Sequence, residues 1–283
     1  MPSDVCLIRT YQRPELLHHC LDRLWWAHKP ESFSVQGKID FHEGKTAHQG
    51  ILDLFESPII NGFSITCTHL NIGDSCAFLR ALKSTFRLNP DRIYNVEEDV
   101  LIAPDFFRWH QAAQAMGYDI TVASNLHGDP RISSDSDPKA CIEMNRASAI
   151  GCCFSRRFAE LLVEHCVPEY YQSHQTMQQY LDRHFPGEPS GDVAWDGLMA
   201  RLIRKHNLKV LWPARPRCYH AGWYGLNRGK SNPYSYMTLK DQIKAVGEVI
   251  HNEAKLFELG DYRQDCRVFS LEEKPWQKLK IIS

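Results

Sequence analysis

Short apolar segments alternate with amphipathic helical segments along most of this 283-residue chain, and this alternation constrains the fold more than any other feature. Apolar residues three or four positions apart, such as Leu17, Leu21 and Leu24, indicate helices, whereas a compact apolar run such as residues 5–8 indicates a buried strand. Strands that alternate with helices form a largely parallel sheet, which binds ligands at the carboxyl ends of its strands. We therefore expect an α/β fold.

The expected elements follow one another with short connections. The expected strands span residues 5–8, 35–41, 63–68, 92–96, 120–123, 147–153 and 210–212. The expected helices span residues 14–24, 46–55, 73–86, 106–116, 158–166, 192–205 and 238–259. Gly, Asp, Pro, Arg and Ser gather in residues 128–137 and predict a loop there, and the polar stretch 171–190 is expected to hold one helix.

Composition fits one main domain with appendages, because 43% of the residues are hydrophobic and 24% are charged. The amino terminus lacks a basic segment followed by an apolar core, and no run of about eighteen apolar residues occurs. We expect a soluble, cytoplasmic protein with no membrane span. The ten cysteines are scattered and form no C-x-x-C pair, which favours reduced thiols over disulfides or a zinc site.

The most informative segment is an apolar strand that ends in three consecutive acids. Residues 92–96 lead directly into Glu97, Glu98 and Asp99, and the chain then returns to apolar residues and a proline-led helix. Three acids after a strand are commonly a solvated turn, but this triplet interrupts an apolar stretch. Carboxylates at the carboxyl edge of a central strand can hold Mn²⁺ or Mg²⁺ against two phosphates. Such a cation neutralises the charge that develops on a departing nucleotide diphosphate.

Residues 96–107 are similar to the metal-binding segment of the N-acetylglucosaminyltransferase I family, whose pattern is Glu-Asp-Asp, a short apolar stretch and then Ala-Pro-Asp-Phe-Phe. The opening strand and its proline-led helix resemble the nucleotide-sugar entry of GT-A fold transferases. The resemblance covers residues 4–225 and implies a GT-A fold, with a Rossmann-like, mostly parallel sheet flanked by helices. It also implies that Asp99 is the direct metal ligand. Glu98 stands where the family has Asp, and we expect Glu97 and Glu98 on the donor side.

A second similar segment contains the expected catalytic base. Trp195-Asp196-Gly197-Leu198-Met199 resembles a Trp-Asp-Asp-Trp-Met segment whose acid is the base, although Gly197 stands where the family has its second acid. An inverting transfer needs one carboxylate to take the proton of the acceptor hydroxyl, since a metal-bound diphosphate leaves without protonation. Asp196 is therefore expected as the base and Trp195 as an acceptor contact. The alternative for Asp196 is a first-turn acid of a helix, and Asp192 is expected as the helix cap or as the fallback base.

Residues after the last expected strand of this region extend the predicted site. In several GT-A enzymes a late histidine completes the metal shell, so the resemblance makes His220 a candidate metal ligand, with a structural histidine as the alternative. Trp223 and Tyr224 are candidates to stack on the acceptor sugar or base, or simply to pack. Arg228 and Lys230 are candidates to meet the donor diphosphate, and a solvated pair is the alternative.

The remaining donor candidates follow other strands. Arg9, Thr10 and Arg13 lie where the first strand ends, which is the position at which α/β sheets receive nucleotides. Ordinary surface charge is the alternative for Arg13. Asp40 resembles the second-strand acid that reads uridine, and its alternative is a turn acid. Asn125 ends another strand and is expected to line the sugar or acceptor pocket.

These residues predict one catalytic domain and one appendage. We expect the GT-A domain over residues 1–230, with a nucleotide-sugar half at about 1–105 and an acceptor half at about 106–230, followed by a C-terminal helical extension over 231–283. The expected activity is inverting, metal-dependent glycosyl transfer from a nucleotide sugar, expected to be a UDP-sugar, to an acceptor hydroxyl.

Charge leaves the class of acceptor open between a glycan and a hydroxymethylated DNA base. Residues 200–283 hold 16 Lys and Arg against 8 Asp and Glu, which leaves 17 against 26 for residues 1–199 out of totals of 33 and 34. A basic C-terminal third suits a diphosphate or the phosphates of DNA, and solvated helix faces are the alternative. Overall charge is near zero, and no basic run interleaved with aromatic residues occurs, which argues against DNA.

Other functions of nucleotide-binding α/β proteins fit less well. Gly44-Lys45-Thr46 looks like the end of a phosphate loop, but the motif needs a glycine where Ile39 stands, which excludes an NTPase of that type. A sugar nucleotidyltransferase shares the fold class, but Thr10-Tyr11-Gln12-Arg13-Pro14 replaces its glycine-rich first loop with an activating lysine. A sugar-nucleotide-binding protein without turnover is the other alternative, and the presence of both predicted acids argues against it.

Overall fold

The structure is a computed structural model that describes residues 4–11, 13–39, 51, 53, 63–67, 73–124, 140–188, 192–213, 216–222, 237–238, 240–241, 244, 267–271 and 279–281. Among these residues, no helix combines the length and the apolar character that crossing a bilayer requires. Eight of the cysteines in the described segments have described side chains, and these eight are buried and carry free thiols.

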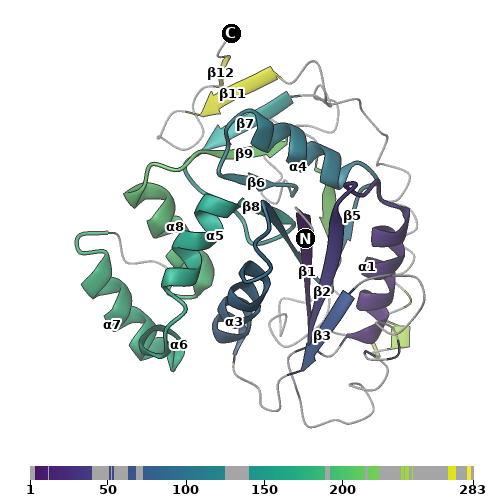
Figure 1. Ribbon diagram of the computed structural model, residues 1–283, viewed down its shortest axis with the longest axis horizontal. Coiled ribbons are helices and arrows are strands. Elements are labelled where there is room, and N and C mark those ends of the chain that lie inside the picture. The colour runs from purple at the N-terminus through teal and green to yellow at the C-terminus, as the bar shows by residue number, and fades with distance from the viewer. Residues whose placement is uncertain are drawn as a thin grey trace.

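In the described residues, ten strands form one central sheet in the order β12-β11-β7-β9-β6-β8-β4-β1-β2-β3 (Figure 1). The strands are β1 (Asp4–Thr10), β2 (Phe33–Ile39), β3 (Phe63–Cys67), β4 (Arg92–Glu97), β6 (Ile120–Val122), β7 (Ala140–Met144), β8 (Cys152–Ser155), β9 (Val210–Pro213), β11 (Arg267–Leu271) and β12 (Leu279–Ile281). Strands β7, β8 and β11 run against the other seven. A separate antiparallel pair joins β5 (Val100–Ile102) to β10 (Cys218–His220). The expected α/β class with a mostly parallel sheet is confirmed.

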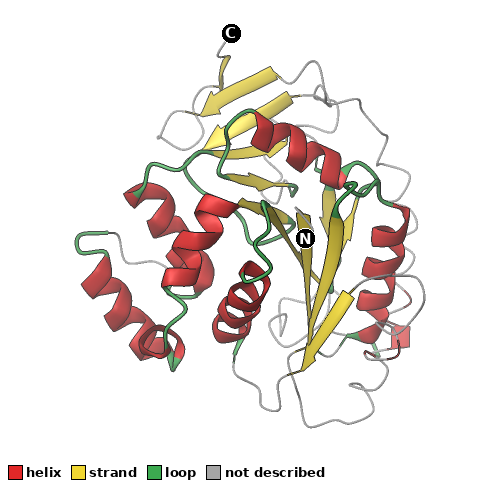
Figure 2. Ribbon diagram, in the orientation of Figure 1, coloured by secondary structure: helices red, strands yellow, loops and turns green. Residues whose placement is uncertain are grey.

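Helices lie on both faces of the sheet (Figure 2). They are α1 (Pro14–Trp26), α3 (Asp74–Phe86), α4 (Phe106–Ala115), α5 (Arg156–Glu164), α6 (Pro168–Tyr171), α7 (His174–His184) and α8 (Trp195–Lys205). Alternation along β1 explains the two layers, because successive side chains of a strand point to opposite faces. Leu7 packs in one buried cluster with Phe78 of α3, whereas Ile8 packs in another with Leu17 of α1 and Phe107 of α4.

The predicted elements agree with the structure apart from several short strands. In place of the strand predicted at residues 147–153, the structure has β8, which begins only at Cys152 and ends at Ser155. Strands β5, β7 and β10 were not predicted. Strands β5 and β10 have three residues each, too few for an apolar period to be recognised. Strand β7 directly follows the segment whose composition predicts a loop. The predicted helix at 46–55 lies largely outside the described residues, although Ile51 and Asp53 are helical.

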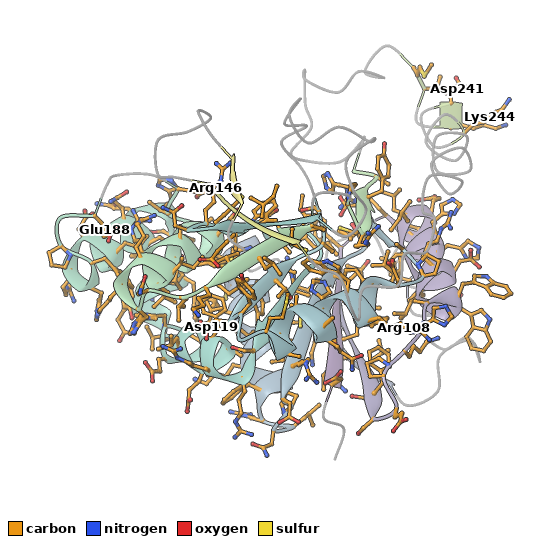
Figure 3. The ribbon with its side chains drawn as sticks, turned by 90° about the horizontal axis from the view of Figure 1, so that it is seen from above. Arg108, Asp119, Arg146, Glu188, Asp241 and Lys244 are labelled. Carbon is orange, nitrogen blue, oxygen red and sulfur yellow. The ribbon has the colours of Figure 1, made fainter. Side chains whose placement is uncertain are left out.

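The C-terminal extension predicted as helical contains strands as well. Lys240, Asp241 and Lys244 are helical, and the last two are labelled in Figure 3. Strand β11 pairs with β7, and β12 pairs with β11, so both extend the central sheet. The prediction of a wholly helical extension is therefore wrong. Pairing with β7 satisfies main-chain groups that a sheet edge would otherwise leave open. The predicted domain boundary at residue 230 stays a prediction.

Two glycines separate the cost of backbone strain from the cost of a steric clash. Gly117 and Gly151 have φ of 90° and 58°, and a Cβ at Gly151 would lie 2.5 Å from Cys218 Sγ, whereas a Cβ at Gly117 would meet nothing within 4 Å. We expect Gly117→Ala to lower the free energy of unfolding by about 1–2 kcal/mol. Gly151→Ala should lower it further because β10 must shift. Urea denaturation measures both values, and equal losses would contradict the close contact with β10.

Candidate functional site

The register between β1 and β4 brings the acid triplet to the first loop. The two strands are parallel neighbours in which Arg9 lies opposite Glu97. The main-chain N–H of Glu98 then donates to the carbonyl of Arg9 at 2.9 Å. Because parallel strands end at the same edge, the acids after β4 lie beside the residues after β1.

Glu98 is surrounded by donors from the first loop and is only 2% exposed. The Thr10 hydroxyl and the Tyr11 main-chain N–H donate to Oε2, the latter at 2.7 Å, and Arg13 Nε donates to Oε1 at 2.6 Å. Both carboxylate oxygens of Glu98 thus accept from protein groups. Glu98 therefore bonds to the loop between β1 and α1, and its expected contact with the donor stays a prediction.

Asp99 lies between that loop and β10. In the β5–β10 pair, Val100 lies opposite His220, and the Ala221 N–H donates to the Asp99 carbonyl at 2.7 Å. On the side chain, Asp99 Oδ2 lies 2.8 Å from Arg13 Nη1 and 3.3 Å from His220 Nε2. The two residues predicted as metal ligands, Asp99 and His220, come from distant parts of the sequence and are in contact.

The group formed by Arg13, Glu98, Asp99 and His220 is called the Asp99 cluster below. Burial alone would raise the pKa of Asp99, but the hydrogen bond with His220 and the charge of Arg13 outweigh burial and lower that pKa to about 2. Asp99 is therefore ionised at neutral pH. Within the part of the chain that the structure describes, its other oxygen, Oδ1, is buried and has no hydrogen-bond partner.

Gly222 leaves open the space next to these side chains. A Cβ at Gly222 would lie 2.4 Å from Asp99 Oδ2 and 2.8 Å from His220 Nε2, closer than side-chain carbons approach other atoms. Glycine is therefore needed for Asp99 and His220 to approach each other here. The sequence analysis missed this role, although a glycine two residues after a candidate ligand is a signal that could have been used.

The residues present fit a divalent cation in part. Across the described segments, no group of three or more His, Cys, Asp and Glu side chains lies close enough together to bind a metal alone. Asp99 and His220 offer two ligands, including an unpartnered buried oxygen. Mg²⁺ commonly takes one or two carboxylates and completes its shell with phosphate and water, which suits a site of this kind.

A buried ion pair holds β10 against the start of α4. Arg217 is fully buried, and its Nε lies 3.4 Å from Asp105 Oδ2. The Ala103 N–H donates to the Arg217 carbonyl at 2.9 Å, and the Arg217 N–H donates to the Ala123 carbonyl at 2.6 Å. Asp105 belongs to the Ala-Pro-Asp-Phe-Phe run, so that run anchors the strand that carries His220. Sequence reasoning missed Arg217 because a lone arginine gives no signal of burial.

Arg9 connects Glu97 to the first turn of α8. Its guanidinium pairs with Glu97, donates to Asn95 Oδ1 at 3.3 Å, and lies 5.0 Å and 5.3 Å from the ring centres of Phe78 and Trp195. The Trp195 ring stacks on Phe78 at 3.8 Å, and Trp195 is 1% exposed. The prediction of Trp195 as an acceptor contact is therefore corrected, because the ring packs inside the protein and supports α8 instead.

The two candidate bases flank this buried tryptophan. Asp196 lies in the first turn of α8 and is partly exposed, and Asp192 is exposed and accepts from the Ala194 N–H at 2.9 Å. Ala194 is the cap residue, so the expectation that Asp192 caps α8 is wrong. A Cβ at Gly197 would lie 1.7 Å from the Asp192 carbonyl oxygen. This close packing leaves no room for a side chain at position 197.

Several predicted site residues lie outside the described residues. They are Asp40, Asn125, Trp223, Tyr224, Arg228 and Lys230. Their donor and acceptor roles stay predictions.

Adding a methyl group at Gly222 tests the geometry of the Asp99 cluster. We expect Gly222→Ala to separate Asp99 Oδ2 from His220 and to weaken Mn²⁺ binding at least tenfold, the range seen when groups that orient metal ligands are changed. Isothermal titration calorimetry measures the Mn²⁺ affinity. Gly117→Ala is the control, since it adds the same methyl group in open space. Unchanged Mn²⁺ affinity in Gly222→Ala would contradict the expected crowding.

Comparisons with known proteins give distant likenesses. No family model and no curated protein match the chain. S. aureus TarS (residues 1–349) in complex with UDP-GlcNAc is 14% identical over 92% of this chain and 68% of that chain, with a TM-score of 0.49. The mannosyltransferase PcManGT from Pyrobaculum calidifontis, in complex with GDP-Man and Mn²⁺, is 13% identical over 91% and 76%, with a TM-score of 0.43. Mouse xyloside xylosyltransferase 1 is 11% identical over 73% and 83%, with a TM-score of 0.41. Membership of the N-acetylglucosaminyltransferase I family stays a prediction.

Proposed function

We propose that this chain is a metal-dependent glycosyltransferase of the GT-A type that moves a sugar, with inversion, from a UDP-sugar to an acceptor hydroxyl. The observation that carries the proposal is the state of Asp99. It is a buried, ionised carboxylate at the carboxyl edge of β1 and β4, where α/β sheets receive nucleotides. Its contact with His220, and its Oδ1 oxygen, for which the described residues supply no hydrogen-bond partner, suit a divalent cation that also binds a diphosphate.

The residues of the Asp99 cluster have different roles in binding the donor. Asp99 and His220 would hold Mn²⁺ or Mg²⁺, and the bound cation would supply Lewis acidity toward negative charge on the leaving diphosphate. Glu98 keeps Arg13 and the first loop in place through its bonds to Thr10 and Arg13. The low pKa of Asp99 keeps its ligand oxygens unprotonated at neutral pH.

Asp196 is the proposed base. As the acceptor hydroxyl oxygen bonds to the anomeric carbon, the bond from that carbon to the diphosphate oxygen breaks, and its electron pair leaves with the diphosphate. The hydroxyl proton passes to a carboxylate oxygen of Asp196. Asp196 lies in the first turn of α8 and is partly exposed, so an acceptor can reach it. Trp195, packed against Phe78 and Arg9, holds this turn beside the edge of the sheet.

The acceptor hydroxyl belongs in this proposal to a glycan or to a hydroxymethylated DNA base. The two differ in electrostatics, because binding to the phosphates of DNA weakens steeply as salt rises, whereas binding of a neutral glycan does not. A sugar-nucleotide-binding protein without turnover would bind the donor in the same cluster and would fail to transfer.

Replacing Asp99 tests the metal site. Asp99→Asn keeps the size of the side chain and removes its charge, so Mn²⁺-stimulated hydrolysis of the UDP-sugar should fall by about a hundredfold or more, since a metal ion contributes several kcal/mol to the transition state. Release of UDP, measured for the donor that most raises the melting temperature in the presence of Mn²⁺, gives the rate. The matched control is Asp91→Asn, an exposed aspartate at the start of the same strand region, which should behave as wild type. Full Mn²⁺ stimulation in Asp99→Asn would remove Asp99 from the metal site.

Replacing the two candidate bases separates binding from transfer. We expect Asp196→Asn to keep the affinity for the donor while transfer falls by about 10²–10⁴, the usual contribution of a general base. Asp192→Asn should keep both donor affinity and transfer within a small factor of wild type. Single-turnover transfer and UDP-sugar titration are the measurements. The reverse pattern, with transfer lost only in Asp192→Asn, would assign the base to Asp192.

A further inference from the structure

Arg13 joins the two buried acids of the Asp99 cluster. Its Nε lies 2.6 Å from Glu98 Oε1, and its Nη1 lies 2.8 Å from Asp99 Oδ2. One guanidinium therefore bonds to both carboxylates through different nitrogens. Asp99 is the same residue that the proposed function assigns to the divalent cation.

A guanidinium and a divalent cation repel each other when both lie on one carboxylate. Arg13 bonds to Asp99 Oδ2, so a cation bound to Asp99 would lie within a few ångströms of the positive charge of Arg13. Asp99 is buried, and solvent ions screen this repulsion only weakly. Two carboxylates and one guanidinium leave a net charge of −1. The charge of Arg13 therefore opposes the binding of a cation to Asp99.

The position of Arg13 allows its outer nitrogens to change partner. Arg13 precedes α1, and its side chain is 22% exposed, whereas those of Glu98 and Asp99 are 3% and 5% exposed. Its bond to Glu98 uses Nε, the nitrogen nearest the backbone, so Nη1 can leave Asp99 while Nε stays on Glu98. Guanidinium groups bind phosphate oxygens at least as well as carboxylates, through paired hydrogen bonds.

From this geometry we propose that Arg13 is a positioning residue that acts as a resident counter-ion of Asp99 and moves to the donor diphosphate when the donor binds. Its departure frees Asp99 for the divalent cation. Cation and nucleoside diphosphate therefore bind with positive coupling, and Arg13 carries part of that coupling, in addition to direct contact between metal and phosphate. This inference rests on the proposed function, since it assumes that the Asp99 cluster binds both ligands.

The test measures the Mn²⁺ affinity of the full chain with and without UDP, using the electron paramagnetic resonance signal of free Mn²⁺. GDP serves as a second arm in case the donor carries guanosine. We expect Arg13→Gln, which keeps hydrogen bonding and removes the charge, to bind Mn²⁺ about tenfold more tightly than wild type when no nucleotide is present. UDP should tighten Mn²⁺ binding less in Arg13→Gln than in wild type. Arg13→Lys, which cannot bond to both acids at once, should give a smaller gain in the same direction.

Arg108→Gln is the matched control. Arg108 is an exposed arginine of α4 (Figure 3), so this variant makes the same change in net charge away from the cluster and should leave both Mn²⁺ affinities as in wild type. Melting temperatures establish whether each variant is folded. If Arg13→Gln does not fold, the Mn²⁺ affinities of Arg13→Lys are used instead.

The outcomes separate this inference from the proposed function. Mn²⁺ binding that is lost in Asp99→Asn but equal to or weaker than wild type in Arg13→Gln would overturn the counter-ion role and leave the metal site intact. A wild-type chain that binds no Mn²⁺, with or without UDP or GDP, would overturn both. If UDP tightened Mn²⁺ binding as much in Arg13→Gln as in wild type, Arg13 would carry none of the coupling.

Discussion

The burial of two adjacent carboxylates, Glu98 and Asp99, is the constraint on which the rest of the site depends. Ionised carboxylates are costly to remove from water unless they are paired and hydrogen-bonded. Their partners come from two separate parts of the chain, the loop between β1 and α1 and the strand β10. Each partner in turn requires support, and the Arg217–Asp105 ion pair and Gly222 provide it for β10. The architecture around the sheet edge therefore pairs both carboxylates with cationic or hydrogen-bonding groups, while Asp99 Oδ1 stays without a hydrogen-bond partner among the described residues.

The end of β4 divides the acid triplet between two groups of residues, because Glu97 is the last residue of the strand and Glu98 and Asp99 lie in the turn that follows. Glu97 continues the face that carries Asn95, and it pairs with Arg9 over Phe78 and Trp195. The next acid turns to the α1 side, where the first loop lies. Three consecutive acids thus serve two different groups of residues. One group supports α8 and its candidate base, and the other forms the candidate metal site.

Much of the fold could be predicted from the sequence because its longer elements carry clear apolar periods, as in α1 and α3. The sequence also predicted Asp99 and His220 as candidate metal ligands, and these two residues are in contact, although their metal-binding role stays a prediction. It could not show that β5 and β10 bring the two together, because three-residue strands have no period and their pairing depends on tertiary contacts. Trp195 was assigned to the acceptor because the sequence does not distinguish an aromatic ring that faces a ligand from one that packs on Phe78.

The β5–β10 pair has a consequence for the order of events during synthesis. Asp99 leaves the ribosome long before the strand that carries His220, and loop closure over such a separation is slow. Arg13, Glu98 and Asp99 are all synthesised before β10, so the ion pairs of Arg13 need no residue that comes later in the chain. In a nascent chain, Arg13 would then pair with Glu98 and Asp99 before His220 has been synthesised.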